Sequence, residues 1–221
     1  MCEIVNKEDV SEAREVFENW ISKVRKVLKK DYKIHFACDI IGSGKRKLVI
    51  RQCNRNGFFD LDYQITLTRL PKELAENINN KAKDVKNIFR KTFDDNKPSD
   101  FTFCEDSTQA LTIKSNDKKF GFDVIIIRIE NDDKYILYNK KNTNTKCKGN
   151  NKDYCWEIRS DDLKFRDRMK KIKNADKWQF LRNSYRDKRH EYKDSVDGKK
   201  SFQILNEAVV NTLKEFHIDY K

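Results

Sequence analysis

The sequence predicts an α+β fold whose C-terminal part is helical. Apolar residues recur at helical spacing near the N-terminus, alternating segments separated by turn residues fill the middle of the chain, and helical spacing returns after residue 160. With 221 residues the chain is long enough to bury a core. We expect a core domain over residues 1–160 and a helical segment over residues 161–221 that packs on it.

The first predicted elements are one helix and two strands. Apolar residues spaced by three and four predict an amphipathic helix over residues 9–30, capped by Asp9 and Glu12. The stretch "YKIHFACDII" predicts a strand over residues 32–41, which ends at a glycine-rich turn. "FFDLDYQITL" predicts a second strand over residues 58–67.

The rest of the chain predicts one helix, four strands and further helices. Pro71 is typical of a helix start, and the spacing of apolar residues continues that helix to about Phe93. After a loop over residues 97–108, two hairpins are predicted, with strands at 109–114 and 119–129 and at 134–139 and 153–159.

The chain is strongly basic, with 48 Lys and Arg against 36 Asp and Glu, a net charge of +12. This favours a polyanionic partner such as a nucleoside triphosphate, RNA or DNA, although an anionic membrane surface or a role in solubility would also fit. The acidic N-terminus and the absence of a run of 18 apolar residues predict a cytoplasmic protein without a membrane span.

The six cysteines form no C-x-x-C pair and have no neighbouring histidine, so the sequence offers no zinc set. We expect free thiols, with a disulfide between Cys147 and Cys155 as the alternative.

Two aspartates in "FDLDY" are the first candidate site residues. Side chains alternate along a strand, so Asp60 and Asp62 share one face while the apolar residues between and around them face the core. Carboxylates at this spacing start about 7 Å apart at the backbone. They can converge on two divalent ions, and Mg²⁺ suits such carboxylates together with phosphate oxygens. A solvated strand face is the structural alternative.

A third aspartate lies within "FGFDVIII". Asp123 is surrounded by large apolar residues, and an ionised carboxylate there is costly unless it is paired or bound to a metal. The alternatives are a salt bridge to a lysine or arginine, or a strand end open to water. The preceding Gly121 indicates that another group approaches the backbone closely.

The stretch "GSGKR" precedes the paired aspartates. Gly42, Ser43 and Gly44 can present backbone N–H groups and a hydroxyl to phosphate oxygens, with Lys45 and Arg46 beside them. The spacing is not that of a Walker A loop. A solvated cationic hairpin is the alternative, since "KLVIRQ" at residues 47–52 predicts a strand.

In order, "IIGSG", "FFDLDYQI" and "FGFDVIII" resemble the three signature elements of the DNA polymerase beta-like nucleotidyltransferase superfamily, over residues 8–215. The resemblance implies a mixed or antiparallel sheet with flanking helices. It also implies a magnesium-dependent or manganese-dependent enzyme that transfers a nucleoside monophosphate from a triphosphate such as ATP to an acceptor hydroxyl. The predicted strand at residues 47–52 departs from the family, which usually has a helix there.

The same resemblance implies roles for individual residues. Ser43 and the backbone of Gly42 and Gly44 would hold the triphosphate, and Asp60 and Asp62 would bridge two metal ions. Asp123 would bind the catalytic ion and help deprotonate the acceptor.

The acceptor is open at this stage, with RNA or a second nucleotide favoured by the positive charge. Aromatic and basic residues near the C-terminus could bind it: Trp178, Tyr185 and Tyr192, with Lys177, Lys188 and Arg189. A buried face shared by Trp178 and Tyr185 is the structural alternative. A non-catalytic basic RNA-binding module is the second functional hypothesis, and a metal-dependent nuclease the third.

Overall fold

The computed structural model describes residues 3–51, 57–117, 119–140, 153–159, 163–192 and 201–219. They form two compact units. The first, which we call the sheet unit, contains Asn6–Val49 and Phe59–Arg159; the second, the helical unit, contains Met1–Val5, Ile50–Phe58 and Ser160–Lys221. The division into domains at residue 160 stays a prediction.

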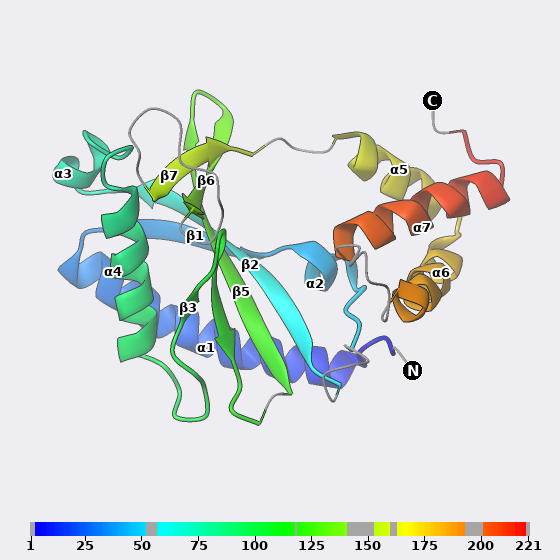
Figure 1. Cartoon of the computed structure of the whole chain (residues 1–221), viewed down its shortest axis with the longest axis horizontal. Helices are drawn as coiled ribbons and strands as arrows, with labels where there is room; N and C mark the ends of the chain where they lie inside the picture. The colour runs from blue at the N-terminus through cyan, green and yellow to red at the C-terminus, as the bar shows by residue number, and fades with distance from the viewer. Residues whose placement is uncertain are drawn as a thin grey trace. The chain divides into compact units, whose positions relative to one another are not determined.

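The sheet unit is a mixed seven-stranded sheet with helices against it (Figure 1). Its elements are α1 (Lys7–Asp31), β1 (His35–Ile40), α2 (Gly42–Arg46), β2 (Phe59–Arg69), α3 (Lys72–Ala75), α4 (Ala82–Asp95), β3 (Glu105–Asp106), β4 (Ala110–Lys114), β5 (Phe120–Glu130), β6 (Asp133–Asn139) and β7 (Tyr154–Ile158). The strand order is β1-β2-β5-β4-β3, and β6 joins β5 to β7. β2 and β5 run parallel, whereas the other pairs are antiparallel. The predicted α+β class and both hairpins are confirmed.

Helix α1 covers one face of the sheet (Figure 1). The Phe17 ring stacks on Tyr63 of β2 at 3.7 Å between centroids and lies 4.9 Å from Phe122 of β5. The predicted cap of this helix is wrong: Asn6 is the N-cap, and its side chain accepts the backbone N–H of Asp9 at 2.8 Å. Asparagine is among the best N-cap residues because its short side chain reaches that N–H.

Strand β2 shows the alternation that the sequence predicted. Its buried residues are Phe59, Leu61, Tyr63, Ile65 and Leu67, whereas Asp60 and Asp62 are half-buried on the opposite side. Asp123 shares their side of the sheet, because it is the strand partner of Asp62. We call this side the aspartate face. The apolar side packs beneath α1, so the core leaves the aspartate face available for chemistry.

Two local predictions are wrong. The helix predicted from Pro71 to Phe93 is broken into α3 and α4, because the asparagine-rich stretch around Ile78 favours turns over a continuous helix. Residues 42–46 form the short helix α2 where a turn was predicted, and Lys47 ends it in the left-handed region at φ 57°. Residues 48–51 then form no strand apart from an isolated bridge at Ile50. Gln52 lies outside the described residues.

The three cysteines that the structure describes are in two states. Cys38 and Cys104 are free thiols, as expected. Cys155 is disulfide-bonded, which corrects the expectation of free thiols throughout. Its partner lies outside the described residues, as does Cys147.

The helical unit contains α5 (Leu163–Asn174), α6 (Trp178–Glu191) and α7 (Ser201–Glu215). Its core includes the buried side chains of Leu181 and Tyr185 from α6 and of Leu205 and Val209 from α7. The predicted helical C-terminal part is therefore confirmed. Across the residues placed by the structure, no helix combines the length and apolar character needed to cross a membrane.

Candidate active site

Asp62 and Asp123 occupy directly paired positions on the parallel strands β2 and β5. Neighbouring strands lie about 4.8 Å apart, so the two carboxylates start side by side on the aspartate face. Asp60 lies two residues before Asp62 on the same face, but its partner on β5 is Gly121. The structure thus brings Asp62 and Asp123 together. Asp60 lies on the same face, two residues earlier on β2.

The proximity of Asp62 to Asp123 is visible in its electrostatics. Burial raises the pKa of the Asp62 carboxyl to about 6, and the charge of Asp123 adds to the rise. The Ser43 backbone N–H, Arg46 and Arg159 act in the opposite direction. Two adjacent carboxylates that repel each other suit a divalent cation, because bound positive charge favours both ionised forms.

The structure describes no group of three or more Asp, Glu, His or Cys side chains arranged to hold a metal ion within its described ranges. The metal-binding role of Asp60 together with the other two aspartates therefore stays a prediction. The pair formed by Asp62 and Asp123 fits the carboxylate part of a Mg²⁺ site, in which waters and phosphate oxygens are the usual further ligands.

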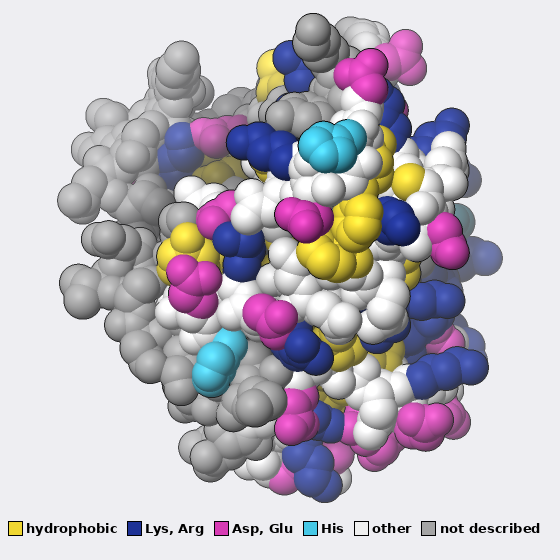
Figure 2. Space-filling view, turned by 90° about the vertical axis from the view of Figure 1, so that its right-hand side faces the viewer, with side chains coloured by type: hydrophobic (Ala, Val, Ile, Leu, Met, Phe, Trp, Pro, Cys, Tyr) yellow, Lys and Arg dark blue, Asp and Glu magenta, His cyan; other side chains and the backbone are white. Residues whose placement is uncertain are grey.

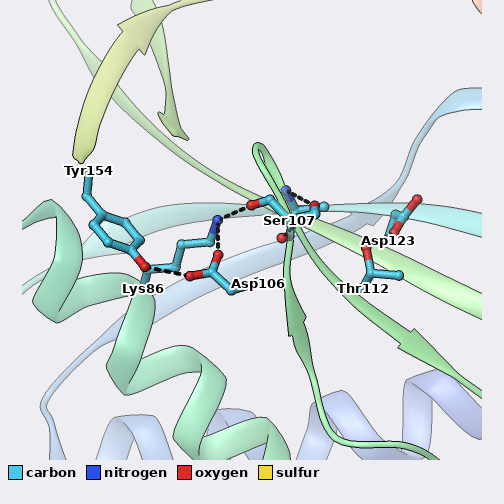
Figure 3. Close-up of polar contacts among 7 residues, drawn as sticks. Lys86, Asp106, Ser107, Thr112, Asp123 and Tyr154 are labelled. Carbon is cyan, nitrogen blue, oxygen red and sulfur yellow. Dashed lines mark hydrogen bonds and ion pairs between the residues drawn. The ribbon is translucent and has the colours of Figure 1, made fainter. Parts of the chain in front are cut away.

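Asp123 is held by a neutral donor. The Thr112 hydroxyl of β4 donates to its Oδ1 at 2.5 Å (Figure 3). Thr112 is the strand partner of Asp123 across the β4–β5 ladder. The salt bridge considered for Asp123 is thus replaced by a hydrogen bond that leaves the negative charge in place.

The glycine-rich helix α2 begins directly against Asp62. Gly42 has φ +58°, and a Cβ at this position would lie 2.1 Å from Asp62 Oδ2. The Ile41 N–H donates to the Asp62 carbonyl at 2.8 Å. A side chain at residue 42 would therefore displace the carboxylate.

The remaining predicted phosphate-binding residues differ in their surroundings. The backbone N–H of Ser43 interacts with the Asp62 carboxylate. A Cβ on Gly44 would lie 2.6 Å from Ile40 Cδ1, so this glycine permits close packing of α2 on β1. Lys45 is exposed, whereas Arg46 is half-buried and close enough to Asp62 to lower its pKa. Their binding of phosphate stays a prediction.

Sequence reasoning missed Arg159. Its Nη1 donates to Gln64 Oε1 of β2 at 3.3 Å, and its charge acts on Asp62. Gln64 follows Asp62 by two residues on the same side of β2. The sequence gives little reason to select Arg159, because it is one of 48 basic residues and belongs to no recognisable motif.

A buried ion pair fixes the hairpin that carries Thr112. Lys86 of α4 is fully buried, and its Nζ lies 2.7 Å from Asp106 Oδ1 and donates to the Ser107 carbonyl at 2.8 Å (Figure 3). The Tyr154 hydroxyl donates to Asp106 Oδ2 at 2.7 Å. Burial lowers the pKa of Lys86 despite the opposing effect of Asp106. The interactions join α4, β3 and β7.

Most of the residues considered for acceptor binding serve the helical unit itself. Of the buried face considered for Trp178 and Tyr185, only Tyr185 is buried, whereas Trp178 is half-buried. Lys188 Nζ lies 2.7 Å from Glu207 Oε1, and the Tyr192 hydroxyl donates to the same carboxylate. On the face shown in Figure 2, the described Lys and Arg side chains alternate with acidic and apolar ones. This face is not a uniform basic surface.

No protein-family model matches the sequence, and no curated protein matches it. Solved structures do match the fold. The STING-associated CdnE c-di-GMP synthase from Capnocytophaga granulosa has a TM-score of 0.61 and 16% identity over 99% of this chain and 64% of its own. The Vibrio cholerae DncV cyclic AMP-GMP synthase, a prokaryotic cGAS homolog, has a TM-score of 0.64 and 10% identity over 95% of this chain and 68% of its own.

A third match is a mutant of the Vibrio cholerae di-nucleotide cyclase in complex with ATP and GTP, with a TM-score of 0.65, 11% identity, and coverage of 95% of this chain and 69% of the other. These structural neighbours are described as a c-di-GMP synthase, a cyclic AMP-GMP synthase and a di-nucleotide cyclase. The chain has their fold. It spans about two thirds of the length of the neighbours, and its identity to them is low.

Proposed function

We propose that the protein is a Mg²⁺-dependent nucleotidyltransferase that moves a nucleoside monophosphate from a nucleoside triphosphate to an acceptor hydroxyl. The observation that carries this proposal is the paired placement of Asp62 and Asp123 on the aspartate face of a nucleotidyltransferase fold. Phosphoryl transfer chiefly needs positioning and charge neutralisation, and carboxylates with divalent ions provide both.

The predicted residues then take distinct roles. Asp62 and Asp123, with Asp60, hold the divalent ions, either Mg²⁺ or Mn²⁺, in a two-metal arrangement. When bound, the ions neutralise charge on the phosphates. Gly42, Ser43 and Gly44, together with Lys45 and Arg46, bind the triphosphate; the nearness of α2 to Asp62 supports this assignment.

The reaction itself requires one bond to form and one to break. The acceptor hydroxyl oxygen attacks the α-phosphorus, and the bond from that phosphorus to the pyrophosphate oxygen breaks. The hydroxyl proton passes to a carboxylate, and we assign this role to Asp123, which Thr112 holds by a neutral hydrogen bond. The pyrophosphate leaves with the electron pair of the broken bond.

A second nucleotide is the acceptor that we favour over RNA. Structural neighbours are described as c-di-GMP and cyclic AMP-GMP synthases, which supports a nucleotide acceptor. To test this, the protein is incubated with Mg²⁺ and single or paired labelled triphosphates, with and without bulk RNA, and the products are separated by chromatography. We expect nucleotide products without RNA. Labelled RNA alone would contradict the nucleotide acceptor.

The alternative is a non-catalytic basic RNA-binding module in which the aspartates are structural. The net charge of +12 supports it. RNA binding that is the same in wild type and Asp62→Asn, with no triphosphate turnover in either protein, would favour this alternative.

A further inference from the structure

Thr112 lies within a row of four paired residues on neighbouring strands: Glu105 of β3, Thr112 of β4, Asp123 of β5 and Asp62 of β2. Paired residues on adjacent strands present their side chains on the same face. The row therefore places a hydroxyl next to one carboxylate and that carboxylate next to the second. The 2.5 Å distance from Thr112 Oγ1 to Asp123 Oδ1 is typical of a short hydrogen bond to a charged acceptor (Figure 3).

We propose that Thr112 is a positioning residue of the candidate active site, which orients the Asp123 carboxylate toward a divalent cation. This inference rests on the proposed function. By donating to Oδ1, the hydroxyl fixes the rotation of the carboxylate about its terminal bond and leaves Oδ2 as the oxygen for the ion. Groups that orient a metal ligand in this way commonly contribute tenfold or more to metal affinity.

The chemistry of the donor suits this role. A lysine or arginine at residue 112 would also orient Asp123, but its positive charge would compete with a cation for the carboxylate. A hydroxyl supplies direction while the charge of Asp123 remains available. Thr112 is also β-branched, so its side chain has few rotamers and loses little freedom when it is held in place.

The position of Thr112 is fixed from the other end of its hairpin. Strand β3 is only two residues long, so it holds β4 weakly. Lys86 reinforces it by binding both Asp106 and the carbonyl of Ser107. The Ser107 hydroxyl in turn donates to the Ala110 carbonyl at 2.9 Å, where β4 begins. The buried ion pair and the turn therefore hold the start of β4, and the pairing of β4 with β5 places Thr112 beside Asp123.

The test compares Thr112→Val, which removes the hydroxyl at nearly constant shape, with Thr112→Ser, which keeps it. The matched control is Thr92→Val, because Thr92 is a buried threonine of α4 whose hydroxyl donates to the Ile88 carbonyl. Binding of Mn²⁺ is measured by calorimetry with a non-hydrolysable nucleoside triphosphate present, and turnover of triphosphate is measured separately.

We expect Thr112→Val to weaken Mn²⁺ binding by about tenfold and to lower kcat, with the KM for triphosphate nearly unchanged. Thr112→Ser should restore both, and Thr92→Val should match the wild type. Circular dichroism checks that each variant is folded. Because the triphosphate is non-hydrolysable, Mn²⁺ affinity is measured independently of turnover.

Three outcomes would overturn the inference. Wild-type Mn²⁺ affinity in Thr112→Val, when Asp123→Asn has lost it, would refute the role of Thr112 and leave the proposed function intact. An equal loss of Mn²⁺ affinity in Thr92→Val would show that removing any buried threonine hydroxyl weakens binding. Unchanged Mn²⁺ affinity in both Asp62→Asn and Asp123→Asn would refute the proposed function, and the inference with it.

Discussion

Asp62 and Asp123 are direct partners across the parallel strands β2 and β5, although 61 positions separate them in the sequence. Parallel pairing at this register places their carboxylates on one face, opposite the side that packs under α1. Burial and the neighbouring charge of Asp123 disfavour the ionised form of Asp62 and raise its pKa.

Replacing Asp62 by asparagine should stabilise the protein at neutral pH. The folded pKa of about 6 lies above the ordinary value of 3.8, so the stability associated with the protonated form is complete below 3.8 and is lost as the pH rises through about 6. One pKa unit corresponds to about 1.4 kcal/mol. Allowing for partial solvent screening, we expect Asp62→Asn to gain about 1 to 2 kcal/mol at pH 7.5 and little at pH 3.5.

Urea unfolding at the two pH values measures this effect without added metal. Asp133→Asn, at an exposed position of β6, controls for the loss of one negative charge. A destabilised Asp62→Asn at pH 7.5 would show that its ionised carboxylate is stabilising rather than costly.

Replacing Gly42 by alanine should damage the site beyond its effect on the backbone. The new methyl carbon would lie only 2.1 Å from Asp62 Oδ2, so the carboxylate would have to move. Gly57 is a matched control, because its φ of +78° carries a similar backbone cost while its Cβ would meet Arg51 only at 3.6 Å. The positive φ alone should cost each variant about 1 kcal/mol of stability, and Gly42→Ala should lose more because of its contact with Asp62.

Turnover distinguishes the two glycine variants. We expect Gly42→Ala to lose nearly all triphosphate turnover and Gly57→Ala to keep it. Equal activity in the two would mean that α2 does not need to begin so close to Asp62.

The buried Lys86–Asp106 pair should be expensive to break from one side. Lys86→Met leaves the Asp106 carboxylate without its cation, and such losses commonly cost 3 to 5 kcal/mol. We expect the double variant Lys86→Met, Asp106→Leu to be more stable than Lys86→Met alone, because no charge is then left unpaired. Denaturant unfolding of the four proteins forms a double-mutant cycle. Additive losses would contradict a direct coupling.

Arg159 should support the binding of triphosphate. Its positive charge acts on Asp62 from the position directly after β7, and one of its nitrogens donates to Gln64. We expect Arg159→Gln to raise the KM for triphosphate by about fivefold, which corresponds to about 1 kcal/mol, with a smaller effect on kcat. Arg69→Gln, at the exposed end of β2, is the control. A KM that is unchanged at low ionic strength would exclude this role.

Local pattern was sufficient for much of the sheet. Alternation in "FDLDY" correctly placed Asp60 and Asp62 on the face opposite the core, since side-chain direction in a strand follows from the backbone. Local pattern was insufficient for α2. Two of its five residues are glycines, which have low helix propensity, and the helix depends on packing against Asp62 and Ile40.

Long-range register could not be read from the sequence. The predicted strands over residues 109–114 and 119–129 do not specify which residues pair, whereas in the structure the Ser115 hydroxyl accepts the N–H groups of Lys119 and Phe120 at the turn. The register of this hairpin pairs Thr112 with Asp123. The pairing of β2 with β5 is still harder to predict from the sequence. Parallel strands are connected by a long stretch of chain, so their register depends on tertiary packing rather than on a turn.

The most direct test of the central claim is Mg²⁺-dependent release of pyrophosphate from nucleoside triphosphates, measured side by side for wild type, Asp62→Asn, Asp123→Asn and the control Asp133→Asn. We predict release by wild type and Asp133→Asn that stops on chelation of the metal, and a loss of about a hundredfold or more in the two site variants. Release that is undiminished in folded Asp62→Asn and Asp123→Asn would contradict the central claim.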